Sequence, residues 1–577
     1  MLTSLDFTFP LDSGSVRAPD AELGNARLWL IGSLGETGSL HELAGDSTDD
    51  NASQAALLLA GFEKAGSRAL RDLTGIFAGI WQQGTTVHLF RDALGCEPLH
   101  YRQHDGRLFV HSDMLPLGRL GARPRVDANW LAGFLLLIPE ARDATAYRDV
   151  HRVPPGSIVT IEPGREPRVE LYWAPDLQQL DLSLEEAVAT AERLVDKRLQ
   201  AHGKAPLLLS AGVDSNVMLS RLAQAGNLGD AITGSPSVHA EAAGGDTIDE
   251  YPLAHAAYHA VGGGGDHYRL RAAPSGLREA IDWGFEAFER PMYNPSNLGW
   301  MDGCQALAAT LGDGTVFDGT LGNFTIGHNG EHPVVALAAQ RRWRDMLAEC
   351  ARHGGHGLRA VWREAPPEWL LRLKTPSAGR RQAKRMYLKT SNRFVASERR
   401  RAVAAGYQAD QPADGMPFPQ RRLRDVILQL DLANSKRAAR RRHGVELVDP
   451  YGHPELVAFS LRLPEELYRQ PKRVRRVQRA MLDPRLPEII RLGRAGGMQG
   501  ADWRAAAIRD AALMRQIVDR LRDGHPGAEI FDVEAMDRTL RQWPASGWND
   551  EEQVMTYRVR LMRTLTGAAF AQWVAEQ

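Results

Sequence analysis

The sequence predicts an α/β protein of two domains, one spanning residues 1–175 and the other residues 176–577. A chain of 577 residues is longer than a single hydrophobic core normally supports. Up to residue 175, short apolar runs bounded by Gly, Asp or Pro are typical of strands joined by turns. Farther along, strand-like runs alternate with helical patterns, which indicates a parallel sheet covered by helices on both faces.

The expected elements follow this division. In the first domain we expect strands at 87–92, 108–113 and 157–163, and a turn at 153–157. In the second, a helix over 183–200 opens with a capping box formed by Ser183 and Glu186. Further strands are expected at 205–210, 231–235, 267–271 and 315–319, with helices at 216–226 and 249–261. Beyond residue 330 the chain is expected to be mostly helical.

Composition excludes some classes of partner. The chain has 70 basic and 71 acidic residues, a net charge of −1, so nothing favours a nucleic acid or a membrane surface. Two segments, 371–403 and 436–442, are strongly basic, and we interpret them as solvated helix faces. No apolar run is long enough to cross a bilayer.

The cysteines and the N-terminus predict a cytoplasmic protein. Cys96, Cys304 and Cys350 are far apart and form no CxxC pair, which argues against a disulfide framework or a zinc site. The opening residues, MLTSLDFTFPLDSGS, lack the basic start and apolar stretch of a signal peptide.

The strongest chemical signal is the stretch APLLLSAGVDSNVMLSRL, residues 205–222. A buried strand leads into small residues, and a helix follows directly. Small residues let the backbone wrap around an anion, and the helix N-terminus is positive there. Asp214 could hold the Mg²⁺ that neutralises a phosphate. The alternative is an ordinary strand–turn–helix in which Asp214 caps the helix.

This stretch resembles the SGGxDS pyrophosphate loop of the ATP pyrophosphatases, with Ala211 at the first Gly position. The resemblance implies ATP and Mg²⁺ as cofactors and adenylation as the reaction. It assigns the nucleotide to Leu209, Ser210, Gly212, Val213, Asp214, Ser215, Thr233 and Gly319. It assigns the metal to Asp214 and Asn323.

A second resemblance is to asparagine synthetases. It is carried by residues 73–113, by RVPPGS at 152–157, by Tyr172-Trp173, by Asp249-Glu250 and by residues 445–467. It implies a glutaminase-like α+β sandwich of the Ntn type followed by a doubly wound ATP-pyrophosphatase domain with helical additions. The expected activity is AMP-forming carbon–nitrogen ligation.

The departures from that family are informative. Its glutaminases carry Cys directly after the initiator Met, and here position 2 is Leu2, so we expect a first domain without glutaminase activity. Where the family has SGEGSDE, this chain has residues 318–325, DGTLGNFT. Asn323 replaces a Mg²⁺-binding Asp, and Thr320 replaces a catalytic Glu. Asp318 is a candidate for the missing charge.

These departures resemble the macrolactam synthetases that close lasso peptides. Glu289-Arg290-Pro291, the segment 294–297 and the segment 494–503 share that likeness. The resemblance implies that an Asp or Glu side chain of a precursor peptide is adenylated and attacked by the peptide's N-terminal amine. It also implies a leader-binding protein and a leader peptidase as partners. Arg494 is the nearest equivalent of the family's catalytic lysine, suited to stabilising charge but not to acting as a base.

Several alternatives remain open at this stage. Arg494 could be a surface-loop arginine, and residues 294–297 could be a turn that bonds its own backbone. The chain could be an ammonia-using asparagine synthetase or a β-lactam-type amide synthetase. It could also be a non-catalytic homologue that binds nucleotide or peptide.

Overall fold

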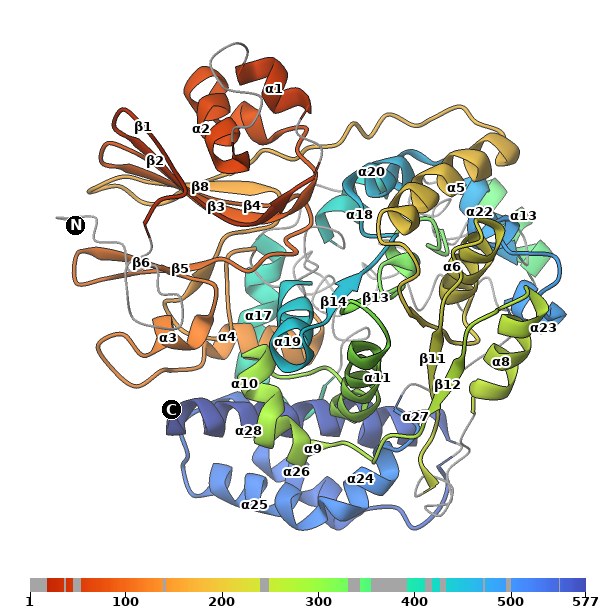
Figure 1. Ribbon diagram of the computed structural model, residues 1–577. Helices are drawn as coiled ribbons and strands as arrows, with labels where there is room; N and C mark the ends of the chain where they lie inside the picture. The colour runs from red at the N-terminus through yellow and green to blue at the C-terminus, as the bar shows by residue number, and fades with distance from the viewer. Residues whose placement is uncertain are drawn as a thin grey trace.

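The first part of the protein is a sandwich of two antiparallel sheets (Figure 1). The computed structural model describes residues 18–35, 38–44, 53–138, 142–238, 249–330, 343–353, 392–409, 418–425, 432–470, 473–493, 500–548 and 550–577. The larger sheet has the order β1 (Ala21–Leu23), β2 (Ala26–Leu34), β3 (Gly75–Gln83), β4 (Thr86–Arg91), β8 (Ser157–Ile161) and β9 (Arg168–Leu171). The smaller has the order β6 (Arg107–His111), β5 (His100–His104) and β7 (His151–Arg152).

Alternating side chains of these strands form two cores. Val87, Leu89 and Val159 point between the two sheets and pack against Tyr101 of β5 and against Leu99, which directly precedes that strand. Phe77, Trp81 and Phe90 point to the opposite face, which α1 (Gly38–Ala44) and α2 (Gln54–Ala65) cover. The expected strands at 87–92, 108–113 and 157–163 are confirmed as β4, β6 and β8.

The second part is built on a parallel sheet of five short strands. Its order is β12 (His267–Leu270), β11 (Ala231–Gly234), β10 (Leu207–Leu208), β13 (Thr315–Phe317) and β14 (Glu446–Val448). Helices α6 (Val213–Gln224) and α8 (Tyr251–Ala260) contact one face, and α11 (Leu298–Leu311) and α19 (Ala433–His443) contact the other. The α/β fold class is therefore confirmed.

The strand order reverses at β10. From β10 the chain moves outward to β11 and β12, and it later returns to the other side of β10 with β13 and β14. Ligands of open α/β sheets bind at such a switch point, beyond the carboxyl ends of the strands. The predicted phosphate loop follows β10, so the topology places it there.

A layer of helices lies beneath the sheet in Figure 1. It contains α24 (Trp503–Arg509), α25 (Ala511–Arg522), α26 (Val533–Arg541) and α28 (Met562–Glu576). Helix α4 (Ala128–Leu136) of the first part packs against α28 and α17 (Ser397–Ala409), and its leucines belong to the same hydrophobic cluster. One core is thus shared between the N-terminal region and the C-terminal helices.

Beyond residue 330 the described residues are mostly helical, as expected, with the short strands β14, β15 (Arg469–Gln470) and β16 (Arg473–Val474) between the helices. One expectation from the sequence is corrected here. The basic segment 436–442 was expected to be solvated, but it lies on α19, where Lys436 and Arg437 are buried. The other basic segment, 371–403, lies outside the described residues up to residue 391.

Arg437 joins the two parts of the protein. Its guanidinium pairs with Asp113 of the first part and lies 3.2 Å from Glu289 Oε2 of the second. Glu289 also accepts from the amides of Met114 and Leu115, at the start of α3 (Met114–Gly118). Burial alone would raise the pKa of Asp113, but the neighbouring arginines outweigh it and lower that pKa.

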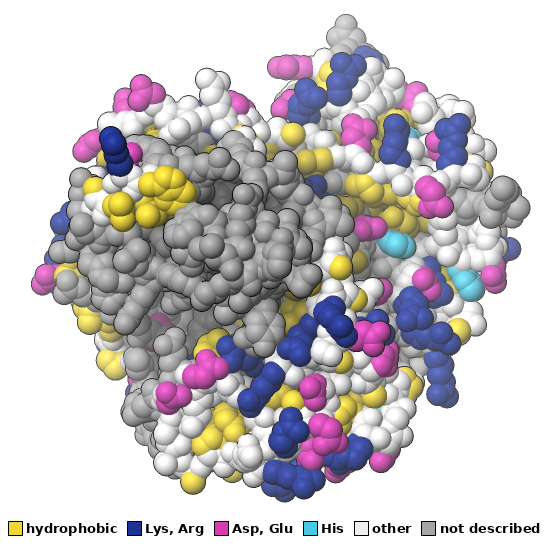
Figure 2. Space-filling model, turned by 180° about the vertical axis from the view of Figure 1, so that it is seen from behind, with side chains coloured by type: hydrophobic (Ala, Val, Ile, Leu, Met, Phe, Trp, Pro, Cys, Tyr) yellow, Lys and Arg dark blue, Asp and Glu magenta, His cyan; other side chains and the backbone are white. Residues whose placement is uncertain are grey.

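The surface carries charges of both signs. On the described part of the face in Figure 2, basic and acidic side chains are interspersed. None of the helices in the described part of the chain combines the length and the hydrophobicity needed to cross a bilayer.

We expect Arg437→Met to lower the free energy of unfolding by about 3–5 kcal/mol, because it leaves two carboxylates buried without their cation. Urea unfolding measures this. Arg520→Met is the control, since Arg520 pairs with Glu576 at 2.9 Å on an exposed surface and its loss is expected to cost about 1 kcal/mol or less. Equal losses in the two variants would contradict a joining role for Arg437.

Candidate active site

The predicted phosphate loop connects β10 to α6 and is fixed by its own side chains. Ser215 Oγ lies 3.0 Å from Ser210 Oγ and accepts from the Ser210 amide at 3.1 Å. Asn216, which the sequence motif did not include, donates to the carbonyls of Ser210 at 2.9 Å and Gly212 at 2.8 Å. Leu209 and Val213 are buried, so their side chains anchor the loop in the core. These contacts preorganise the loop.

The N-terminus of α6 meets the loop at Gly212. Gly212 is the N-cap and supplies no side-chain acceptor for the first helical amides, so the alternative in which Asp214 caps the helix is wrong. The Ala211 amide donates to Glu250 Oε2 at 2.8 Å. A carboxylate of the protein itself therefore lies against the loop, in the way that an anionic ligand of a helix N-terminus would.

Asp214 lies on the first turn of α6 and faces two other segments. Its Oδ1 accepts from Gln478 Nε2 at 2.6 Å, and its Oδ2 lies 3.2 Å from Arg475 Nη1. A methyl group at Gly322 would overlap its carboxylate, so only glycine fits there. Tyr451 donates its hydroxyl to the Asp214 carbonyl at 2.7 Å.

The turn after β13 brings three more predicted residues to this place. Gly319 packs against Asp214, since an added Cβ would lie 3.5 Å from Asp214 Cβ. Asn323 Oδ1 accepts from Arg475, so the two predicted metal ligands meet on one guanidinium. Thr320 is exposed, and its amide donates to Asp318 Oδ1 at 3.1 Å.

Arg475 precedes α22 (Arg476–Ala480), and no motif in the sequence pointed to it. Its three nitrogens donate to oxygens of Asp214, Asn323 and Asn329, the last at 3.1 Å. Carboxylate and amide oxygens are the ligands that Mg²⁺ prefers. The donor set therefore fits a magnesium ion, although no cluster of three His, Cys, Asp or Glu side chains suited to a metal occurs in the described ranges.

Asp449, directly after β14, holds the turn after β13 in place. It accepts from the amides of Leu321 at 2.6 Å and Tyr451 at 2.9 Å. Complete burial raises the pKa of Asp449 well above its ordinary value, and the nearby Asp318 raises it further. Asp449 thus fixes the two segments that carry Gly322 and Tyr451.

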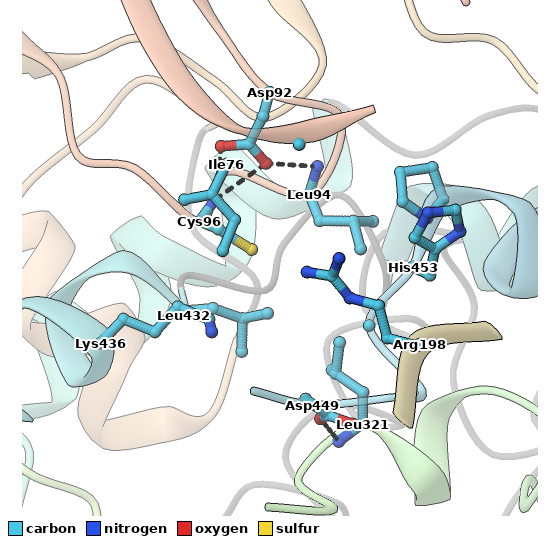
Figure 3. Close-up of a pocket in the computed structure, with 13 residues that line it drawn as sticks. Ile76, Asp92, Leu94, Cys96, Arg198, Leu321, Leu432, Lys436, Asp449 and His453 are labelled. Atoms are coloured by element: carbon cyan, nitrogen blue, oxygen red, sulfur yellow. Dashed lines mark hydrogen bonds between the residues drawn. The ribbon is translucent and has the colours of Figure 1, made fainter. Parts of the chain in front are cut away.

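A small cavity separates the site from the N-terminal sandwich (Figure 3). Its volume is about 20 Å³, enough for a single water molecule. The Arg198 guanidinium points into it from α5 (Leu184–Gln200), opposite Asp92 and Cys96. The Asp92 carboxylate accepts three backbone amides, and burial raises the pKa of Cys96 to about 12, so this thiol stays protonated.

The segments that resemble macrolactam synthetases meet near the end of β11. The Asn294 carboxamide accepts from the Ser296 amide at 3.3 Å, so residues 294–297 do bond their own backbone. A methyl group at Gly500 would overlap Ser296, which places the end of segment 494–503 against this turn. Asp502 accepts from the Ser237 amide at 3.1 Å, just beyond β11.

Other residues of these segments have structural partners or lie outside the description. Arg290 lies over the rings of Trp130, Phe134 and Tyr293, at 5.4–5.9 Å from the ring centroids. Arg494 falls in the segment 494–499, outside the described residues.

Thr233 ends a chain of three histidines. Its hydroxyl donates to the Leu209 carbonyl at 2.7 Å, so His267 Nε2, 2.8 Å away, must be the donor to Thr233. His267 Nδ1 then accepts from His255 Nδ1 at 3.2 Å, and His255 Nε2 accepts from His259 Nε2 at 3.1 Å. This arrangement requires a neutral His267, because its Nδ1 must accept a hydrogen bond while its Nε2 donates one.

This arrangement predicts a loss of stability in acid. Burial, followed by the charges of His255 and His259, lowers the pKa of His267 to about 4 from 6.5. Between these values the unfolded chain takes up a proton that the folded protein does not, so stability falls as the pH falls from about 6.5 to 4.

His267→Gln keeps a donor for Thr233 and removes this titration. We expect the unfolding midpoint of this variant to fall less than that of the wild type between pH 7 and pH 4.5. Some loss of stability in acid remains in both proteins, because the pKa of His88 is lowered to about 4 and that of His328 to about 3. His41→Gln is the control, because His41 is exposed on α1 and lies outside this chain of histidines. A pH profile of His267→Gln that overlies the wild type would refute the assignment.

No curated protein matches the chain. Solved structures that match include glutamine phosphoribosylpyrophosphate amidotransferase from B. subtilis, complexed with ADP and GMP, and a structure described as the allosteric regulatory enzyme of purine biosynthesis. Both are 14% identical, with a TM-score of 0.20, over 32% of this chain. The chain spans 40% of the length of each, and this similarity carries no functional argument.

Family models cover most of the chain. Residues 40–173 match the glutamine amidotransferase domain, and residues 186–575 match asparagine synthase. The second match spans more than half of the chain and contains the phosphate loop, Asn323 and Arg475. The protein therefore belongs to the asparagine synthase family, whose members use ATP to form amide bonds.

Proposed function

We propose that this enzyme closes a macrolactam ring in a ribosomally made precursor peptide, as lasso peptide cyclases do. ATP and Mg²⁺ bind at the phosphate loop. A leader-binding protein and a leader peptidase present the peptide. Two contacts near the end of β11 carry the proposal: Gly500 lies against residues 294–297, and Asp502 accepts from the Ser237 amide.

These contacts lie next to the phosphate loop because the loops after β10 and β11 are neighbours on the sheet. Strands β10 and β11 are neighbours, so the loops after them lie side by side along the carboxyl edge of the sheet. The loop after β10 is the predicted phosphate loop. The other is bordered by two segments, 294–297 and 500–503, that are about 200 residues apart in the sequence. A site for the acceptor substrate is expected beside the nucleotide, and these segments resemble macrolactam synthetases.

The proposed reaction has two steps, adenylation of a carboxylate and aminolysis of the acyl-adenylate. A carboxylate oxygen of an Asp or Glu side chain attacks the α-phosphorus of ATP, giving an acyl-adenylate and pyrophosphate. The peptide's N-terminal amine then attacks the acyl carbon, releasing AMP and a proton and forming an isopeptide bond. Both reactants belong to one molecule, so holding them in position supplies a large effective concentration.

Individual residues have distinct tasks in this scheme. The amides at the N-terminus of α6 hold phosphate oxygens, and Asp214 with Asn323 would hold the Mg²⁺, which supplies positive charge to the phosphates. Arg475 lies where a guanidinium can follow the departing pyrophosphate. Arg494 and Thr320 stay candidates for stabilising charge at the reacting carbonyl.

The amine is proposed to come from the substrate itself. Burial raises the pKa of both Cys96 and Cys304 to about 12, which leaves these two thiols unreactive at neutral pH. Neither could act as the nucleophile of a glutaminase. Glutamine hydrolysis would therefore not feed this site through them.

A cyclisation assay tests the proposal. The protein is incubated with Mg²⁺-ATP and a leader-free candidate peptide, alongside the same peptide with an acetylated N-terminus and a mixture of aspartate with ammonium. We expect the free peptide alone to lose one water, with one AMP released per ring. Asparagine formation would contradict the macrolactam proposal and keep the adenylating chemistry. The absence of AMP in all three mixtures would favour a non-catalytic nucleotide- or peptide-binding protein.

Gly322→Ala tests the geometry around Asp214. The added methyl group overlaps the Asp214 carboxylate, so we expect AMP release to fall by roughly 100-fold, the order seen when a key charged contact is misplaced. Gly406→Ala is the matched control, because an added Cβ there meets nothing within 4 Å. Thermal unfolding checks that both variants fold. Full activity in Gly322→Ala would show that Asp214 does not take part.

A further inference from the structure

The Arg475 guanidinium lies among oxygen ligands that suit a divalent cation. Nη1 faces Asp214 Oδ2 at 3.2 Å, Nε faces Asn329 Oδ1 at 3.1 Å, and Nη2 bonds to Asn323 Oδ1. Asp214 is also a ligand proposed for Mg²⁺, and so is Asn323. The guanidinium of Arg475 therefore lies between Asp214 and Asn323, the two residues proposed to hold the metal.

The backbone at Arg475 supports a special role for this side chain. Arg475 has φ of +57°, a left-handed conformation that is unfavourable for residues other than glycine. Such strain persists where surrounding contacts hold the residue in place, and it is concentrated at functional sites. Here the strained residue aims its guanidinium at the carboxylate of the phosphate loop.

The surroundings make this cation exchangeable. Arginine stays protonated at any working pH, so Arg475 cannot leave Asp214 by losing its proton. It can leave only if another cation takes its place and another anion receives it. Asn323 and Asn329 are exposed, so a metal can reach these oxygens from solvent. Phosphate oxygens bound at the α6 N-terminus would offer the arginine its new partner.

We propose that Arg475 is the resident counter-cation of Asp214, which Mg²⁺ replaces only when it arrives with the nucleotide. In the nucleotide-free protein Arg475 competes with the metal for Asp214 and Asn323. When Mg²⁺-ATP binds, Arg475 turns from the carboxylate to the phosphates. Metal and nucleotide are thereby coupled, so each strengthens the binding of the other. The inference rests on the proposed Mg²⁺-ATP site and not on the identity of the peptide.

Mn²⁺ binding to the nucleotide-free protein tests this inference without any turnover. Free Mn²⁺ is followed by electron paramagnetic resonance in the wild type, Arg475→Met and Arg473→Met. We expect Arg475→Met to bind Mn²⁺ roughly tenfold more tightly than the wild type, the size of effect given by one charged contact. Arg473 is an exposed arginine two residues away, so Arg473→Met should match the wild type. Adding Asp214→Asn to Arg475→Met should remove the gain.

A second arm measures coupling with α,β-methylene-ATP. The analogue should strengthen Mn²⁺ binding strongly in the wild type and much less in Arg475→Met. Arg475→Lys keeps the charge without the fork and should bind nucleotide-free Mn²⁺ with intermediate affinity; this variant decides the matter if Arg475→Met does not fold.

The outcomes separate the two proposals. The counter-cation inference fails, and the proposed metal site stands, under two conditions. The wild type binds Mn²⁺ in the presence of the analogue, and without nucleotide Arg475→Met and Arg475→Lys bind Mn²⁺ with the same affinity as the wild type. If no variant binds Mn²⁺ even with the analogue, the proposed metal site fails and the inference fails with it.

Discussion

The buried contact of Arg437 with Asp113 and Glu289 holds the N-terminal sandwich against the helix and strand that lead to the site. Removing three charged groups from water is unfavourable unless they meet in good geometry, so the contact tolerates little displacement. It fixes the N-terminal sandwich against α19, and α19 leads directly into β14. Asp449 directly follows that strand and accepts from the Leu321 amide, next to Gly322. A contact between domains is thus transmitted to the phosphate loop through one helix and one strand.

The phosphate loop is balanced by charges of the protein itself. The carboxylate of Glu250 lies on the Ala211 amide, and the guanidinium of Arg475 lies on Asp214. These two groups imitate the two halves of a magnesium–phosphate ion pair. Without them, the Ala211 amide would lose its acceptor and the Asp214 carboxylate would lose its guanidinium in a partly buried site, and both losses are costly. If Mg²⁺-ATP binds as proposed, its ions replace these two partners, so binding would be an exchange of partners.

What the sequence predicted well was local. The phosphate loop lies within eighteen consecutive residues, 205–222, where a strand, a turn and a helix follow one another in the expected order. The helix begins at Val213, three residues before the expected start. The capping box of Ser183 and Glu186 is confirmed for the same reason. Arg475 and Gln478 were missed because they reach Asp214 across more than 260 residues of chain, and only the fold brings them together. The basic run on α19 was misread because composition does not reveal buried carboxylate partners.

The N-terminal sandwich has a structural role that does not depend on glutaminase chemistry. Its helix α4 contributes to the hydrophobic core of the C-terminal helices, and Asp113 supplies one carboxylate around Arg437. Removing the sandwich would expose that core and leave a buried arginine with fewer partners. Loss of an ammonia-producing activity would leave these contacts intact. A family member that takes its amine from the substrate therefore still needs the domain, because the synthetase site is built against it.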